Sequence, residues 1–131
     1  MHDEPSDVTL NVPAVPSSVA IVRSVTAGVA SRMALSYESV DDLRIAVAEA
    51  CNRLFALPDP GQLRVELAPG DDALRVVLST EGGSGAWPRD DHDASLAWKV
   101  IEGLTDAVEE SLVDGRPTIA LVIRTVTMPD G

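Results

Sequence analysis

The sequence predicts a single α/β domain, a two-layer sandwich in which helices cover one face of a mixed or antiparallel sheet. Several segments alternate apolar and polar residues, which is typical of strands with one face in water. Others place apolar residues at spacings of three and four, as helices with one buried side do. The chain has 131 residues, 45% of them hydrophobic, so it suits one domain with a sizeable core. Packing such strands against such helices gives two layers.

The first strand and the first helix follow from the start of the chain. Val8, Leu10 and Val12 alternate with polar residues in "DVTLNVP", which predicts a strand. The prolines of "PAVPSS" end this strand, and its serines offer an N-cap for a helix. Valines at spacings of three and four predict a helix over residues 18–34, although Gly28 and the β-branched content lower its helix propensity.

A second helix begins after Ser39, the predicted N-cap. Asp41 and Asp42 follow in the first turn, where the helix dipole favours acidic side chains. Pro58 and Pro60 end the helix. Its apolar stripe consists of Leu43, Ala46, Val47, Ala50 and Leu54.

The remaining elements are a hairpin, a loop, a third helix and a last strand. Apolar and polar residues alternate in "QLRVELA" and in "ALRVVLS", on either side of the turn "PGDD". This pattern predicts a hairpin with one face exposed to solvent. Residues 81–93 predict a Gly- and Asp-rich loop, and residues 94–112 a helix. "DGRP" then turns the chain into "TIALVIRTV", a strand apolar on both faces and therefore central. Residues 1–131 form one domain, with flexible tails expected at 1–6 and 128–131.

Charge and composition narrow the function classes. Ten basic against 21 acidic residues give a net charge of −11, so direct binding to nucleic acid or to an anionic membrane is not expected. A basic protein partner would complement this charge, and solubility is the alternative reason for it. No apolar run approaches the ~20 residues that span a bilayer, and the acidic N-terminus lacks signal-peptide features, so we expect a cytoplasmic protein. Cys51, the single cysteine, is interpreted as a small core residue.

Three motifs occur in an order that resembles one family. "VDDLRIAVAEACNRL" looks like an N box, "SLAWKVIEGLTDAVE" resembles the helix after a glycine box, and "DGRPTIALVI" is similar to the strand that closes the pocket. The chain thus resembles the GHKL (Bergerat-fold, histidine-kinase-like) ATPases from Val8 to about Thr127. Within them it is similar to the small anti-sigma factors of the RsbW and SpoIIAB type, especially divergent actinobacterial members such as UsfX. The resemblance implies a Bergerat-type fold.

The resemblance assigns Glu49 to the N-box glutamate, which in active members polarises the attacking hydroxyl or water. The family's Mg²⁺-binding asparagine follows four positions later, where this chain has Arg53. Asn52 stands one residue before that position, which places it about 100° away around the helix. Arg53 either forms an ion pair with Glu49 or reaches a phosphate. We interpret Glu49 as vestigial, with a catalytic role as the alternative.

The other boxes are matched unevenly. "EGGSG" is similar to the adenine box, but Glu81 is one methylene longer than the family's aspartate. "SLAW" replaces the next glycine box, where Ala97 lacks the backbone freedom of glycine and Trp98 either fills nucleotide space or packs in the core. The residues that the resemblance assigns to nucleotide binding are Asn52, Arg53, Glu81, Gly83, Gly85, Ser95, Ala97 and Thr118. His92 in "DDHD" is interpreted as part of a solvated loop, with a metal ligand as the alternative.

The resemblance implies an anti-sigma factor. Such a protein binds an alternative sigma factor directly, and a STAS-type anti-anti-sigma protein releases it by competing for overlapping surface. Family members commonly dimerise, so a homodimer is expected. ATP and Mg²⁺ are the implied cofactors, but the altered boxes together predict weak or absent nucleotide binding.

Two alternatives stay open. The first is an active Mg-ATP-dependent serine kinase that phosphorylates its anti-anti-sigma partner with Glu49 as base. The second is a ferredoxin-like small-molecule-binding regulatory domain, because the strand and helix pattern alone does not separate the two folds.

Overall fold

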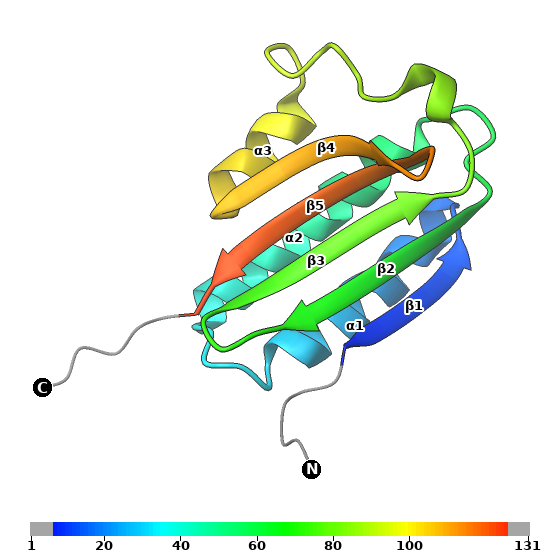
Figure 1. Ribbon diagram of the computed structural model, residues 1–131. Helices are drawn as coiled ribbons and strands as arrows, with labels where there is room; N and C mark the ends of the chain where they lie inside the picture. The colour runs from blue at the N-terminus through cyan, green and yellow to red at the C-terminus, as the bar shows by residue number, and fades with distance from the viewer. Residues whose placement is uncertain (1–6, 126–131) are drawn as a thin grey trace, which may run out of the picture.

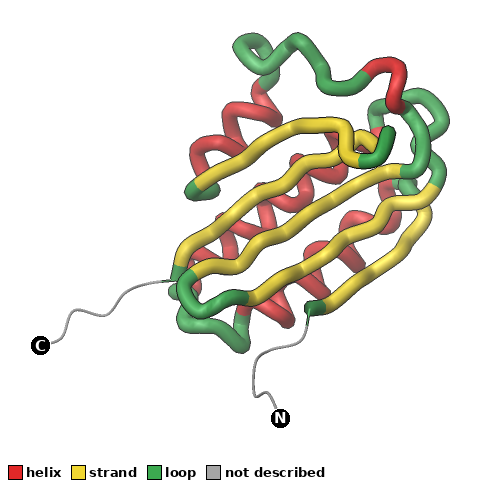
Figure 2. The backbone as a smooth tube through the Cα atoms, viewed as in Figure 1, coloured by secondary structure: helices red, strands yellow, loops and turns green. Residues whose placement is uncertain are grey.

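Within residues 7–125, the part of the chain that the computed structural model describes, five strands form one antiparallel sheet. Three α-helices in this part pack on one face of the sheet and leave the other face open (Figures 1 and 2). This arrangement confirms the predicted two-layer α/β class. The predicted tails at 1–6 and 128–131 lie outside the described residues.

The strands follow the order β1-β2-β3-β5-β4 across the sheet, and all neighbouring pairs are antiparallel. Strand β5 therefore has a strand on each side, which confirms its predicted interior position. The strands are β1 (Val8–Pro13), β2 (Gln62–Pro69), β3 (Ala73–Thr80), β4 (Ala107–Val113) and β5 (Arg116–Arg124).

The strand register separates a buried face from an open face. Val65 is opposite Leu78, and Val76 is opposite Leu121, so apolar side chains line up on the helical side. Their sequence neighbours point to the open face, because successive side chains of a strand alternate. The buried hydrophobic strand residues of the core are Val12, Leu63, Val65, Leu67, Leu74, Val76, Leu78, Ile119, Leu121 and Ile123.

The helices complete the core. Val22, Leu54 and Ile101 are among the helical side chains that are fully buried on the sheet. Cys51 is buried with them, and desolvation raises the pKa of its thiol to about 12, which confirms its interpretation as a core residue. None of the helices in the described part is long and apolar enough to cross a membrane. The helices are α1 (Val19–Ala30), α2 (Tyr37–Phe55) and α3 (Leu96–Leu104), with single 3₁₀ turns η1 (Pro16–Ser18) and η2 (Ser84–Ala86).

The N-cap of α2 is Ser36, so the prediction of Ser39 was wrong. Ser36 has an extended backbone, and its Oγ accepts a hydrogen bond from the Ser39 N–H at 3.0 Å. Ser39 already lies within the first turn, where it supplies the capped donor. The first helix also differs from its prediction, since α1 ends at Ala30.

The predicted helix over 94–112 is wrong in its second half. Helix α3 ends at Leu104, and β4 follows as the edge strand next to β5. Asp114 and Gly115 both have positive φ angles, of 53° and 76°, which closes a tight hairpin between these strands. Backbone pairing with β5 therefore outweighs the helical spacing of the apolar residues. The element order gains a strand between α3 and β5.

The ferredoxin-like alternative is contradicted by the sheet. That arrangement requires four strands, whereas residues 7–125 form five, and β1 lies at an edge with β2 as its partner. A segment that includes η2 also links β3 to α3 across one end of the molecule (Figure 2).

Ser36→Ala is expected to lower the free energy of unfolding by about 1 kcal/mol, because it removes the acceptor at the N-terminus of α2. Ser39→Ala is the matched control: it loses only an exposed hydroxyl contact to Ser36, so we expect a change within ~0.5 kcal/mol. Urea unfolding followed by circular dichroism measures both. An equal or larger loss in Ser39→Ala would place the cap at Ser39 instead.

Candidate functional site

Arg53 is a buried cation near the C-terminal end of α2. The whole residue is 4% exposed and its side chain 2%. Its side chain reaches the edge strand β4 and the N-terminus of α3, where its hydrogen-bond partners lie. A buried charge requires partners that replace its hydration.

Those partners come from three other segments. The Arg53 Nε donates to Glu110 Oε2 of β4, and Nη2 donates to Glu110 Oε1 at 3.2 Å. Nη2 also donates to Asp91 Oδ1 at 2.7 Å, in the loop between β3 and α3. Nη1 donates to the Oγ of Ser95 at 3.0 Å, and the same Oγ caps α3 by accepting from the Trp98 N–H. Arg53 thus joins four segments at one point.

Aromatic side chains and a histidine complete the surroundings. The Arg53 guanidinium carbon lies 5.9 Å from the ring centre of Trp87 and 5.3 Å from that of Trp98, within cation–π range. The Nε2 of His92 lies 2.7 Å from Glu110 Oε1, and its ring meets Trp98 edge to face. We call these residues the Arg53 cluster: Arg53, Trp87, Asp91, His92, Ser95, Trp98 and Glu110.

The contact between Arg53 and Asp91 stabilises the charged form of both side chains. Desolvation would lower the pKa of the Arg53 guanidinium, but hydrogen bonds and attraction from Glu110 and Asp91 raise it above its ordinary value. The hydrogen bond from Arg53 is the main cause that lowers the pKa of the Asp91 carboxyl from its ordinary value of 3.8. Arg53 and Asp91 are therefore both charged at neutral pH.

One expectation about a single residue is corrected, and another is extended. Arg53 does not pair with Glu49, and no ion pair within residues 7–125 involves Glu49, which is half-buried. The buried carboxylate of Glu110 binds the guanidinium instead. His92 lies in a largely exposed loop, as expected, but its ring also contacts Glu110 and Trp98. Within the described chain, no group of three His, Cys, Asp or Glu side chains could hold a metal ion.

The structure brings together only part of the predicted nucleotide set. Arg53 and Ser95 are in contact, and Ala97 lies in the first turn of α3. Asn52 is exposed on α2 next to Arg53. The glycines lie at η2: Gly85 is exposed, whereas Gly83 has φ +89° and a Cβ there would come within 2.7 Å of the Leu57 side chain.

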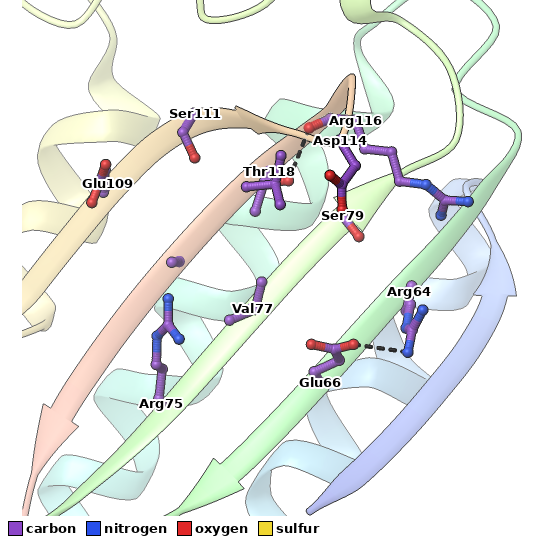
Figure 3. Close-up of a pocket in the computed structure, with 12 residues that line it drawn as sticks. Arg64, Glu66, Arg75, Val77, Ser79, Glu109, Ser111, Asp114, Arg116 and Thr118 are labelled. Atoms are coloured by element: carbon purple, nitrogen blue, oxygen red, sulfur yellow. Dashed lines mark hydrogen bonds and ion pairs between the residues drawn. The ribbon is translucent and has the colours of Figure 1, made fainter.

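Glu81 and Thr118 lie on the other face of the sheet. Thr80 is fully buried on the helical side, so Glu81 projects outward, where its Oε1 accepts from the Gln62 N–H at 2.8 Å. Thr118 lies between the buried Pro117 and Ile119 and lines a depression of about 720 Å³ on the open face (Figure 3). One nucleotide cannot contact Arg53 and Thr118 together, because the sheet separates them.

Glu110 and Asp91 are the site residues that the sequence reasoning missed. Glu110 was placed on a helix, where its direction could not be related to β5. In the β4–β5 register it is opposite Ile119, a buried residue, and so it points to the helical side. A strand assignment for the residues before "DG" would have revealed this direction.

The cluster does not fit the phosphates and Mg²⁺ that the family resemblance implies. The three guanidinium nitrogens of Arg53 already donate to protein oxygens. The carboxylates of Asp91 and Glu110 would repel a phosphate, and the guanidinium fills the position of the family's metal ligand. What this arrangement does chemically is to hold four segments together.

Comparisons with known proteins find a match to the histidine kinase-like ATPase domain over residues 12–123. The serine-protein kinase RsbW of Bacillus subtilis (strain 168) is 34% identical over 88 residues, which cover 64% of this chain and 55% of that protein. RsbW of Bacillus pumilus (strain SAFR-032) is 33% identical over 90 residues, which cover 64% of this chain and 56% of that protein. RsbW of Listeria monocytogenes serotype 4a (strain HCC23) is 40% identical over 88 residues, which cover 64% of this chain and 54% of that protein. The chain spans about half the length of the curated relatives it matches.

Glu110→Gln is expected to lower the free energy of unfolding by about 3 kcal/mol, because it leaves the buried Arg53 without its main counter-charge. Glu109→Gln is the matched control: the adjacent side chain is exposed on the open face, so we expect a change within ~0.5 kcal/mol. Thermal and urea unfolding measure both. Similar values for the two variants would show that the buried pair does not support the fold.

The contact with Arg53 makes stability depend on pH through Asp91. Its pKa is lowered in the folded chain, so its contribution is present above the ordinary value of 3.8 and is lost as the pH falls through the lowered pKa. Asp91→Asn is therefore expected to be less stable than the wild type at neutral pH and to lose less further stability on acidification. Urea midpoints over a pH series test this, and parallel curves for the two proteins would contradict it.

Proposed function

Because the chain belongs to the histidine kinase-like ATPase domain family, we propose that it is an anti-sigma factor that acts by binding rather than by catalysis. It holds an alternative sigma factor away from core RNA polymerase in the cytoplasm. A STAS-domain anti-anti-sigma protein releases the sigma factor by competing for overlapping surface. The observation that carries this proposal is the family match combined with similarity to several RsbW proteins.

The Arg53 cluster supports weak or lost nucleotide binding. Four of the five N–H groups of Arg53 donate to Glu110, Asp91 and Ser95, so the guanidinium is largely occupied by protein oxygens. The predicted adenine contacts Glu81 and Thr118 lie on the far face of the sheet. Glu49 then has no phosphate or metal beside it to act upon.

The charge of the chain supports a basic protein partner. A net charge of −11 attracts a partner with a basic surface and steers it during association. Sigma factors bind DNA through such surfaces, so an acidic protein can cover one while it holds the sigma factor. The same charge opposes direct contact with nucleic acid or with anionic membranes.

The open face of the sheet supports the expected homodimer. Its depression is lined by side chains of both signs, among them Arg75, Arg116, Glu109 and Asp114 (Figure 3). In a dimer with two-fold symmetry, each copy presents the same surface, so the positive groups of one can meet the negative groups of the other. This face lies on the side of the sheet opposite the Arg53 cluster, so dimerisation leaves the cluster accessible to other partners.

One observation favours the alternative of an active serine kinase. Glu49 is half-buried on α2 and free of ion pairs with other described residues, so its carboxylate remains available as a base. In that case the serine substrate belongs to the anti-anti-sigma partner. The kinase alternative requires the Arg53 cluster to rearrange so that ATP and Mg²⁺ can enter.

Purification of the tagged full chain from its native host tests the binding proposal. We expect a sigma factor to co-purify under mild conditions and to be released by a STAS-domain protein. A tagged acidic protein of similar size controls for charge alone. Recovery of no sigma factor would contradict the proposal.

Calorimetry with Mg-ATP on the same preparation separates the two functions. We expect no measurable heat of binding, because the donors of Arg53 are engaged. Tight binding that Glu49→Gln leaves intact, together with phosphate transfer that this variant abolishes, would establish the kinase instead. Glu38→Gln, an exposed carboxylate at the start of α2, is the matched control.

A further inference from the structure

A row of polar side chains crosses the open face of the sheet. Asn11 is opposite Arg64, Arg64 is opposite Ser79, and Ser79 is opposite Thr118, which in turn is opposite Ser111. Directly opposed residues of an antiparallel sheet share one face, with Cβ atoms about 5 Å apart. The row therefore brings three hydroxyl groups side by side in the depression of about 720 Å³, which the last four of these residues line.

Two arginines border this row. Arg116 begins β5 and takes part in no ion pair within residues 7–125. Arg64 binds Glu66 through Nη2 at 2.9 Å, which leaves other N–H groups of its guanidinium for a ligand. Both arginines line the large depression and also a smaller hollow of about 300 Å³. Figure 3 shows Arg116 extending from β5 over the strand that carries Arg64, so two cations serve one part of the face.

We propose that the open face binds a small phosphorylated polyol, with its phosphate held by Arg64 and Arg116 and its hydroxyl groups over the polar row. A phosphate monoester carries a charge of about −1.5 to −2 at neutral pH, which matches two guanidinium groups. Each guanidinium can donate two parallel hydrogen bonds to phosphate oxygens. The depression, at about 720 Å³, has the size of a small-molecule site and takes the rest of the ligand.

The carboxylates of the depression favour a ligand with hydroxyl groups. Glu109 and Asp114 line it, and no ion pair within residues 7–125 involves either of them. An ionised carboxylate only accepts hydrogen bonds, so it binds hydroxyl donors of a ligand and repels a plain anion. None of the described residues that line the depression is aromatic, so a planar ring finds no surface for stacking. These features together select a polyol that carries a phosphate.

The bound ligand competes with a second copy of the chain. In the proposed homodimer, the positive groups of this face meet the negative groups of the other copy. A phosphate on Arg64 and Arg116 occupies these cations and adds negative charge to the face. This competition rests on the proposed function, whereas the ligand site belongs to the single chain.

Amide NMR spectra of the full chain, titrated with glycerol phosphate, test the site. We expect saturable shifts around Arg64, Ser79 and Arg116 and none in α2. Glycerol alone and inorganic phosphate alone separate the two parts of the ligand. We expect each to bind at least about tenfold more weakly, because each lacks one set of hydrogen bonds.

Arg116→Gln is expected to weaken the binding of glycerol phosphate at least about tenfold, because it removes one of the two cations. Arg124→Gln is the matched control, since it removes the same charge from the exposed end of the same strand, outside the depression. The absence of saturable shifts, equal affinity of the two variants, or inorganic phosphate that binds as tightly as glycerol phosphate would overturn the proposal.

Sedimentation velocity separates the ligand site from the proposed homodimer. We expect glycerol phosphate to raise the fraction of monomer. A chain that is monomeric throughout and still binds the probe would contradict the homodimer and support the ligand site. A dimer that persists while the probe is bound would overturn the competition between the two.

Discussion

The buried pair of Arg53 and Glu110 is the contact on which one end of this molecule depends. It joins α2 to the edge strand β4, and the two residues lie 57 positions apart in the chain. Removing two charges from water is costly, and it is offset here because every guanidinium nitrogen has an acceptor and both carboxylate oxygens have donors. The loop after β3 and the first turn of α3 then take their positions from the same guanidinium. One side chain thereby fixes how four segments meet.

Much of the fold could be predicted because its signals are local. Alternation in β1, β2 and β3, the continuous apolar run of β5 and the apolar stripe of α2 are each visible in a short window. The exception was the segment from residue 94 to 112, where apolar residues such as Leu104 and Val108 also fit a helical spacing. The Asp114–Gly115 turn and pairing with β5 decide the outcome, and a pairing between strands is invisible in a window that contains only one of them. The N-cap at Ser36 shows the same limit at a smaller scale, since two serines three positions apart offer equal capping chemistry.

The site was harder to predict than the fold. The N-box resemblance identified Arg53 as an unusual residue, but its partners Glu110 and Asp91 lie on other elements and belong to no motif. A motif also does not state which face of a sheet its residues occupy. Thr80, the last residue of β3, points inward, whereas Glu81, which follows the strand, lies beside Arg64 and Arg116 on the other side of the sheet from Arg53. The same alternation directs Thr118 away from the helices. The family fold is preserved, while the side chains on it serve a different arrangement.

Cys51 lies in the core, on α2 near Arg53. At a pKa of about 12 almost none of its sulfur is thiolate at neutral pH, and thiolate is the form that reacts with peroxides and disulfides. It is also the only cysteine in the chain. Burial and the raised pKa together keep the Cys51 thiol of the folded protein away from oxidants and in its less reactive form.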